Sequence, residues 1–372
     1  MKNSHTTMLL VALITLMLAV DAQAVLRFVS TSGNDTGNDC TIGSSPCHTI
    51  QNAVNHWEDG DIILVAQGQY KENVSMSWSY TVNKTFYFNI MGGWSNDFSS
   101  LSNDPAKTVI DGGAADTVLN ISSASEDIDL TVQYFTLTNG DGISGGGVAV
   151  NNSGATMKVS FKNNIITRNK AQTGAGLYVR TPSGKTEVAL TNNMITDNEA
   201  SSEGGGIYAE AGWYYETEMT LTNNTIAGNY GDSRGGGISI YSHQGGLMTL
   251  KLVNNIIWAN STNPTWGSGD DVHYWEDDTS ADSSTTIEAW YTDPLFVNAA
   301  RGNYHIRSKS PAVDAGWCGT LNYDLSYTRV APYDDFEGDS RPGDIAFFGC
   351  DLGADEYVAK QTAMPWLLLL NE

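Results

Sequence analysis

Positive charge is scarce in this chain of 372 residues, which has 19 lysines and arginines against 42 aspartates and glutamates and a formal net charge of −23. Such an excess of negative charge repels phosphate backbones and excludes nucleic acid as a partner. Charged residues are few, at 16 % against 41 % apolar residues, a balance that provides for a packed core and does not match a disordered chain. The 38 glycines and 17 tyrosines favour turns and strands and argue against a mainly helical fold.

Long hydrophobic runs are missing except near the N-terminus. Lys2, an apolar run of about a dozen residues from Met8 to Val20, and Ala22-Gln23-Ala24 have the order of a secretory signal, and the run is short of the ~20 residues that a bilayer span needs. We expect residues 1–24 to be a cleaved signal peptide, with an uncleaved anchor as the less favoured alternative. The apolar tail within 358–372 is also too short to span a membrane. The protein is expected to be exported to the extracellular or outer-membrane surface, or to the periplasm.

Cysteines are equally few, and the four of them fall into two pairs, Cys40 with Cys47 and Cys318 with Cys350. Cysteines in an exported protein indicate disulfides. Three connectivities are open, and we favour pairing within each end because the repetitive chain between the pairs keeps the ends apart. A metal site is less favoured, since no histidine or cysteine cluster has ligand spacing.

The clearest feature that is present is an internal repeat. Segments containing an Asn-Asn pair recur at a spacing of 29 to 31 residues, at 162–169, 191–198, 222–229 and 253–260. Each unit also has a glycine block followed by alternating residues, and these blocks lie at 145–147, 174–176, 204–206 and 235–237. A third apolar alternation closes each unit, so a repeat holds three short strands and no helix.

Three strands per repeat, joined by Gly and Asn turns, are typical of one coil of a parallel β-helix, in which each strand pairs with its equivalent one repeat later at ~4.8 Å. Glycine and asparagine tolerate the positive φ of tight corners. We predict that the repeated asparagines stack into a ladder whose amides bond the coils above and below. The missing leucine pattern excludes a leucine-rich solenoid, and the lack of Asp after the glycines excludes a calcium-binding nonapeptide roll.

The flanking segments are predicted to be caps. Ile50, Ala53, Val54 and Trp57 follow one another at helical spacing, so this segment can cover the open end of the stack. Bare terminal coils would expose strand edges, and solenoids therefore need such ends.

Both flanks carry a family resemblance. The run Pro46-Cys47-His48-Thr49-Ile50-Gln51-Asn52-Ala53-Val54, followed by Gly60-Asp61-Ile62-Ile63-Leu64-Val65-Ala66, resembles the first coil of bacterial right-handed parallel β-helix proteins of the pectin-lyase-like superfamily. The C-terminal runs Ser310-Pro311-Ala312-Val313-Asp314-Ala315-Gly316 and Asp351-Leu352-Gly353-Ala354-Asp355-Glu356-Tyr357 resemble the choice-of-anchor Q domain. The repeats are also similar to those of polymorphic outer-membrane proteins. The resemblance implies an exported surface protein and no defined reaction.

We therefore expect an all-β monomer, a single-stranded right-handed parallel β-helix of about eight coils with disulfide-bearing caps at both ends. The expected division is a signal peptide at 1–24, an N-terminal helical cap at 25–60, the β-helix at 61–290, an irregular choice-of-anchor Q-like cap at 291–357 and a short apolar tail at 358–372.

Outward positions of successive coils stack into a candidate ligand surface. Counted from the glycine blocks, Tyr178 aligns with Tyr208, and two residues on Arg180 aligns with Glu210. Aromatic faces beside hydrogen-bonding groups hold sugar rings. We predict a ligand site of Tyr178, Arg180, Tyr208, Glu210, Trp213 and Tyr241, with His243 in the neighbouring turn. The alternative is a solvated face with a cross-coil ion pair.

Catalytic candidates are weaker. Polysaccharide lyases of the pectin-lyase-like superfamily combine Ca²⁺ held by carboxylates with an Arg or Lys base, which leads us to consider Arg180 with Glu210, and Arg168 with Asp197 in a second column. Each column offers one acid and one base. A Ca²⁺-dependent lyase needs several carboxylates, and a hydrolase of this shape needs two or three aspartates. No serine lies in a nucleophile-elbow motif, and the cysteines are assigned to disulfides.

Carboxylates gather near the C-terminus, in Asp334, Asp335, Glu337 and Asp339. Hard oxygens of this kind suit Ca²⁺, and the alternative is a loop kept soluble by charge. No cofactor is expected to be required, and Ca²⁺ is the candidate ion.

The favoured function is a non-catalytic surface or secreted protein that binds a polysaccharide or cell-surface glycan through the aromatic face, in adhesion. A polysaccharide lyase or glycoside hydrolase acting on an acidic glycan is the first alternative, although the net charge of −23 repels such a substrate unless Ca²⁺ bridges the two. A passive structural surface protein is the second. The sequence identifies neither the ligand nor the mode of attachment.

Overall fold

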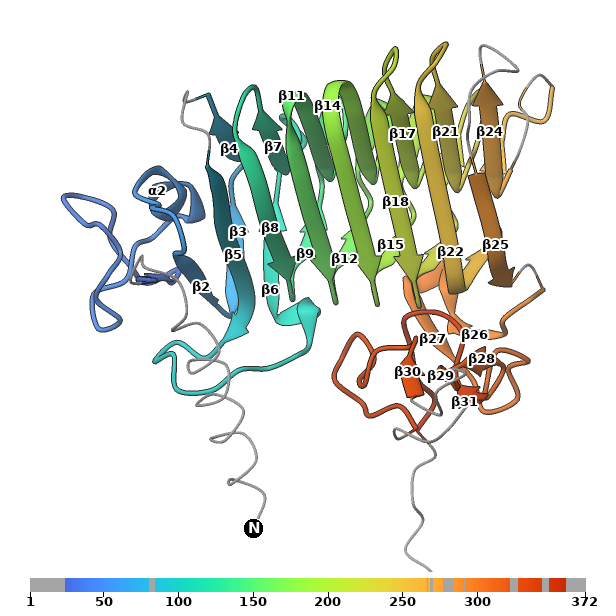
Figure 1. Ribbon diagram of the computed structural model, residues 1–372. Coiled ribbons are helices and arrows are strands. Elements are labelled where there is room, and N and C mark those ends of the chain that lie inside the picture. The colour runs from blue at the N-terminus through green and yellow to red at the C-terminus, as the bar shows by residue number, and fades with distance from the viewer. Residues whose placement is uncertain are drawn as a thin grey trace, which may run out of the picture.

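The computed structural model describes residues 24–79, 84–265, 267, 270–276, 284–290, 292–321, 327–342 and 348–358 (Figure 1). The predicted signal peptide, apart from Ala24, and most of the apolar tail lie outside these ranges. Within them the chain is built from strands, with one short helix, α2 (Ile50–Asn55), and two 3-10 turns, η1 (Pro105–Lys107) and η2 (Ala299–Arg301). None of the helices described has the length and apolar character that a membrane crossing needs.

The strands stack in three parallel columns that form a right-handed β-helix of about seven turns, which confirms the predicted fold class (Figure 1). The first column contains β1 (Leu26–Val29), β2 (Ile62–Ala66), β5 (Thr85–Trp94), β8 (Asp127–Gln133), the second halves of β11 (Val148–Lys162) and β14 (Leu177–Thr191), then β18 (Glu216–Thr222), β22 (Leu247–Trp258) and β25 (Ser284–Trp290). The second column contains β4 (Val74–Trp78), β7 (Leu119–Ser123), the first halves of β11 and β14, then β17 (Ile207–Ala211), β21 (Ile238–Ser242) and β24 (Val272–Glu276). The third contains β3 (Gly68–Lys71), β6 (Thr108–Asp111), β9 (Thr136–Thr138), β12 (Ile165–Thr167), β15 (Met194–Thr196), β19 (Thr225–Ala227) and the end of β22.

A fourth short strand adds to the three predicted for each repeat. These strands pair into a separate parallel sheet of β10 (Asp141–Ser144), β13 (Lys170–Thr173), β16 (Glu199–Glu203), β20 (Tyr230–Gly231) and β23 (Ser261–Thr262). They lead into the glycine blocks, so the coils from β8 onward have four sides rather than three.

The core is a set of stacked apolar side chains that point into the coils. Val148, Leu177, Ile207 and Ile238 occupy equivalent positions on adjacent strands and are all fully buried. The same order of strands and corners in every repeat is what lets each layer cover the apolar face of the next.

Two ladders of buried asparagines join the coils, as the sequence predicts. One contains Asn164, Asn193, Asn224 and Asn255, and the other contains Asn169, Asn198, Asn229 and Asn260. Within each ladder the side-chain Nδ2 donates to the Oδ1 of the next coil at 2.9–3.1 Å. The same Oδ1 also accepts the backbone N–H of the asparagine in the preceding coil. The ladder therefore gives a hydrogen-bond partner to backbone N–H groups at corners, where strand pairing provides none.

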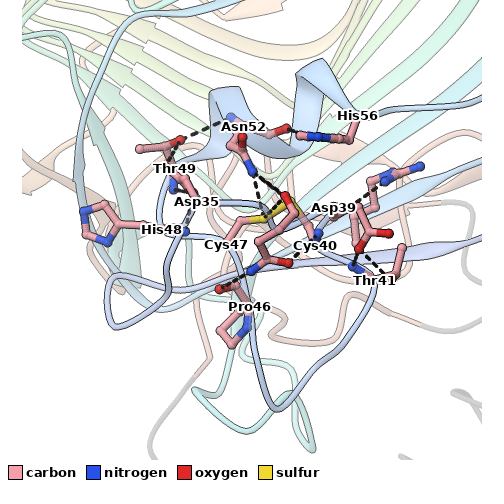
Figure 2. The surroundings of a disulfide bond; sticks show 12 residues. Asp35, Asp39, Cys40, Thr41, Pro46, Cys47, His48, Thr49, Asn52 and His56 are labelled. Carbon is pink, nitrogen blue, oxygen red and sulfur yellow. Dashed lines mark hydrogen bonds between the residues drawn. A yellow bond between two sulfur atoms is a disulfide. The ribbon is translucent and has the colours of Figure 1, made fainter.

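The N-terminal segment closes the first coils, and Cys40 pairs with Cys47 there (Figure 2). Thr49 caps α2 by accepting a hydrogen bond from the Asn52 backbone N–H, and the Asn52 side chain contacts the Cys47 sulfur. Ile50 and the neighbouring Ala53 are fully buried against the core, as expected for a helical cap.

The C-terminal segment, from residue 292, is irregular and carries the second disulfide, Cys318–Cys350, so both favoured pairings are confirmed. It contains three short antiparallel pairs: β26 (Phe296–Asn298) with β27 (Asn303–Ile306), β28 (Gly316–Trp317) with β31 (Phe348–Cys350), and β29 (Gly319–Leu321) with β30 (Tyr327–Arg329). Figure 1 shows these elements against the side of the stack, beneath the ends of β12, β15 and β22. This position differs from a cap stacked over the last coil.

A column of outer asparagines explains this side-on position. Asn163, Asn192, Asn223 and Asn254 have φ of 53–54° and point their amides away from the coils. Those amides donate to backbone carbonyls of the C-terminal segment, namely those of Asp335, Asp334, Asp351 and Trp317. The segment therefore spans four successive coils.

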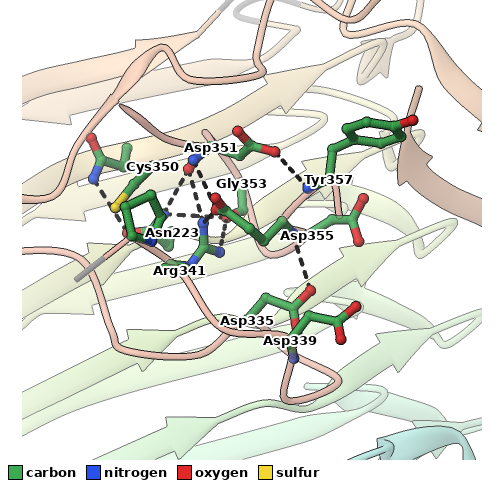
Figure 3. Close-up of polar contacts among 12 residues, drawn as sticks. Asn223, Asp335, Asp339, Arg341, Cys350, Asp351, Gly353, Asp355 and Tyr357 are labelled. Carbon is green, nitrogen blue, oxygen red and sulfur yellow. Dashed lines mark hydrogen bonds and ion pairs between the residues drawn. The ribbon is translucent and has the colours of Figure 1, made fainter. Parts of the chain in front are cut away.

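Arg341 organises the part of this segment that touches the coils (Figure 3). Its side chain has 0 % exposure, and Nη1 lies 2.6 Å from Glu356 Oε2 and 3.0 Å from the carbonyl of Asp351. Nη2 donates to the carbonyl of Gly353 at 3.0 Å. The guanidinium thus ties the stretch around Arg341 to the stretch 351–356.

His305 makes the stability of the C-terminal segment depend on pH. Its Nδ1 lies 2.8 Å from Asp355 Oδ1, and this hydrogen bond, with the nearby Glu337 and Asp335 carboxylates, raises the pKa of His305 to about 9. Because the folded pKa is raised, the stabilisation is fully present below about pH 6.5 and is lost as the pH rises through about 9. We expect limited proteolysis of the segment to accelerate between pH 7 and 10, read on a gel against an internal standard.

The matched control for that measurement is His305→Gln, which can donate a hydrogen bond but does not titrate. Its proteolysis should change less with pH than that of the parent protein. Equal pH dependence in both proteins would contradict this assignment.

Candidate functional site

The candidate surface lies on the outer face of the second column and on the two turns that follow it. Strand pairing places Tyr178 beside Tyr208 and Arg180 beside Glu210, and Glu210 in turn pairs with Tyr241. The sequence alignment of these positions is therefore correct. The turns between β17 and β18 and between β21 and β22 rise above the preceding coils in Figure 1 and carry Trp213 and His243.

Tyr178 and Tyr208 stack with ring centroids 5.5 Å apart and planes 7° from parallel. They are only 8 % and 9 % exposed, and burial raises the pKa of both hydroxyls. This corrects the expectation that their rings present an open face to a ligand. Both instead form a buried stack that supports the surface.

The physical reason is the glycine that begins each block. Gly174 and Gly204 have φ of +64° and +65°, and an added Cβ would lie 2.8 Å and 2.7 Å from the Cβ atoms of Tyr178 and Tyr208. The glycine corner therefore folds over the first outward side chain of the strand.

Aromatic rings that are more exposed than these tyrosines lie further along, on the two turns and on β21 and β24. Trp213 is 54 % exposed and stacks on the His243 ring at 5.9 Å. Tyr241 meets His243 edge to face at 4.6 Å, and it meets Trp275 in the same way at 5.9 Å. We call Trp213, Tyr241, His243 and Trp275 the aromatic strip.

Charged pairs border the aromatic strip on both sides. Glu210 Oε1 accepts from His243 Nε2 at 2.9 Å and lies 3.5 Å from Arg180 Nε. At the other side, the Arg234 guanidinium lies 3.6 Å from the centroid of the Trp275 ring. These groups offer donors and acceptors beside apolar ring faces, which is what recognition of a sugar requires.

The prediction from sequence missed Trp275, Arg234 and Glu203. Arg234 Nη1 lies 3.1 Å from Glu203 Oε1, and both residues directly precede a glycine block. Trp275 is the equivalent of Tyr241 one coil later, after a degenerate block in which the sequence has Gly269-Asp270-Asp271. Extending the alignment through that weaker block would have found it.

Arg168 and Asp197 are not brought together as an open acid and base. They occupy equivalent corner positions with φ of 56° and 55°, next to the C-terminal segment. Asp197 Oδ1 accepts the hydroxyl of Tyr304 at 2.5 Å, and Gly302 lies against the Arg168 guanidinium. Both side chains therefore help to seat that segment, a role that corrects the catalytic hypothesis for this pair.

The four carboxylates of the candidate Ca²⁺ site are not gathered as ligands. Asp335 Oδ1 accepts the backbone N–H groups of Glu337, Gly338 and Asp339, each at 2.9 Å, and Oδ2 accepts that of Glu356. Among the residues that the structure describes, no three His, Cys, Asp or Glu side chains form a group that could hold a metal ion. Asp334, Asp335, Glu337 and Asp339 therefore do not fit Ca²⁺, and Asp335 instead fixes the loop.

A protein-family model supports the fold: residues 122–286 match the model described as "Right handed beta helix region". The crystal structure of pectate lyase Pel9A is similar over 91 % of this chain and 97 % of that chain, at 12 % sequence identity and a TM-score of 0.33. No curated protein matches the chain. From the end of β7 into β25, the chain therefore contains a right-handed β-helix region.

Proposed function

We propose that the protein is an exported, non-catalytic β-helix protein that binds a polysaccharide or cell-surface glycan through the aromatic strip. The observation that carries the proposal is the juxtaposition of Trp213, Tyr241 and Trp275 with two charged pairs on one outer face. Trp275 lies on a strand that the coils hold in place, and Trp213 on the turn between β17 and β18 stacks on His243, so both rings offer binding area at little entropic cost. The two disulfides favour an oxidising compartment, in line with export.

Both arginines on this face lie beside carboxylates. Arg180 Nε lies 3.5 Å from Glu210 Oε1, and Arg234 Nη1 lies 3.1 Å from Glu203 Oε1. Each guanidinium has further N–H groups that can donate to the hydroxyls of a sugar at the border of the aromatic strip.

The test is affinity electrophoresis in gels that contain plant, algal or bacterial polysaccharides. We expect the double variant Trp213→Ala/Trp275→Ala to bind its best polysaccharide roughly fivefold to 150-fold more weakly, since each stacked ring is worth about 0.5–1.5 kcal/mol. Tyr87→Ala is the matched control, because Tyr87 is 47 % exposed on β5 and lies outside the aromatic strip. Both variants should keep the melting temperature of the parent within a few degrees.

Undiminished retention of the double variant would reject the aromatic strip as the binding surface. Cleavage of a polysaccharide that is lost in Glu210→Gln would favour the lyase or hydrolase alternative, in which the hydrogen-bonded pair of Glu210 and His243 supplies the acid and base. A passive structural protein would bind none of the polysaccharides.

A further inference from the structure

A cavity of about 320 Å³ lies where the C-terminal segment meets the end of the third column, away from the aromatic strip. Its lining includes Gly228 and Trp258 from the coils and Phe296 and Tyr304 from the C-terminal segment. Such a volume is at the lower end of the range for pockets that bind small molecules, about 300–1,000 Å³.

The cavity exists because two adjacent residues of this coil, Ala227 and Gly228, have small side chains or none. On the preceding coil, Asp197 fills the equivalent corner and bonds Tyr304. The next corner has Gly228, with φ of +68°, where an added Cβ would lie 2.7 Å from the Tyr304 hydroxyl oxygen. Ala227, beside it, pairs in register with Trp258, so a small residue exposes part of the indole.

The walls of this cavity are held in place by contacts of their own. Trp258 packs against the apolar cluster that includes Ile256 and Ile306, and the Phe296 ring meets the Tyr304 ring edge to face at 5.1 Å. An aromatic wall fixed in this way does not need to reorganise when a ligand enters.

Two groups of opposite charge lie at the rim. Arg307 Nη2 donates to the carbonyl of Val297 at 2.6 Å, which orients the guanidinium. Asp293 Oδ1 accepts the backbone N–H of Leu295 at 2.9 Å, which orients the carboxylate. The rim thus presents a strong donor and a strong acceptor beside an aromatic wall.

We propose that this cavity is a second binding site, which takes one pyranose ring of a glycan. A sugar ring has an apolar C–H face that suits an indole, and its hydroxyls donate and accept at the same time. A hydrocarbon ligand would cover Asp293 and Arg307 without replacing their hydrogen bonds to water. The site does not depend on the aromatic strip, because the two share no residue.

The test uses protein labelled with ¹⁵N in its tryptophan indoles and titrated separately with glucose, galactose, N-acetylglucosamine and galacturonate to about 50 mM. Trp258→Phe identifies the Trp258 signal. We expect at least one sugar to shift that signal saturably and the affinity to fall at least tenfold in Ala299→Phe, which places a ring in the cavity from the surface turn η2. Arg307→Gln should weaken the same titration.

The signals of Trp213 and Trp275 report on the aromatic strip in the same spectra, so failure of one site is distinguishable from failure of the other. A Trp258 signal that no sugar shifts would overturn the proposal. An equal shift in the parent and in Ala299→Phe would overturn it as well.

Discussion

Replacement of Asn193 by alanine is expected to lower the free energy of unfolding by about 3–5 kcal/mol. Asn193 is fully buried in the middle of its ladder. Its Nδ2 donates to Asn224 Oδ1 at 3.0 Å and to the carbonyl of Phe161 at 2.9 Å, and its Oδ1 accepts from the backbone and side chain of Asn164. Alanine would leave several buried partners unsatisfied, at about 1–3 kcal/mol for each before relaxation.

Chemical denaturation followed by circular dichroism measures this effect. Asn151→Ala is the matched control, because Asn151 points outward from β11 and should change stability by no more than about 0.5 kcal/mol. If both variants lost the same free energy of unfolding, the asparagine ladder would contribute no more to stability than an outward-facing asparagine does.

Replacement of Arg341 by methionine is expected to release the C-terminal segment while the β-helix stays folded. Breaking a buried ion pair leaves the other charge uncompensated, at a cost of about 3–5 kcal/mol. Here Glu356 Oε2 would lose a partner at 2.6 Å, and the carbonyls of Gly353 and Asp351 would lose donors. Hydrogen exchange read by mass spectrometry should show lost protection in 292–321, 327–342 and 348–358 and retained protection in β11 and β14.

The double variant Arg341→Met/Glu356→Leu tests the cause. Removing both charges should restore part of the protection, because the uncompensated carboxylate is gone. A single variant whose C-terminal segment exchanges like the parent would contradict the central role given to Arg341.

The sequence predicts the coils well because their physics is local and repeated. The inner asparagines, the glycine corners and the apolar alternation recur every 29 to 31 residues, so aligning the repeats also aligns the strands. Cysteine pairing was predictable for the same reason, since the stack separates the two ends of the chain.

The side-on position of the C-terminal segment was not predictable in this way. Asn163 and Asn164 are the same residue type, yet one amide contacts the backbone of Asp335 and the other contacts the next coil. What separates them is the positive φ of Asn163, which turns its side chain outward. Composition and spacing do not indicate which of two adjacent asparagines adopts that conformation.

The sequence predicted where the candidate site lies, but it predicted only some of the side chains that form its surface. Strand periodicity correctly put Tyr178 and Tyr208 on the outer face, but it does not describe the glycine corner that covers them. Trp275 was missed because its glycine block is degenerate. Its alignment with Tyr241 is found only when the repeats are followed through that weaker block.

The most direct test of binding without catalysis is to incubate the purified mature protein with a panel of plant, algal and bacterial polysaccharides, with and without Ca²⁺. Retention of the protein on the polysaccharide is measured together with release of unsaturated products and reducing ends. The account predicts retention on at least one polysaccharide and no products in either condition. Products that depend on the protein, or a failure to bind any polysaccharide, would contradict it.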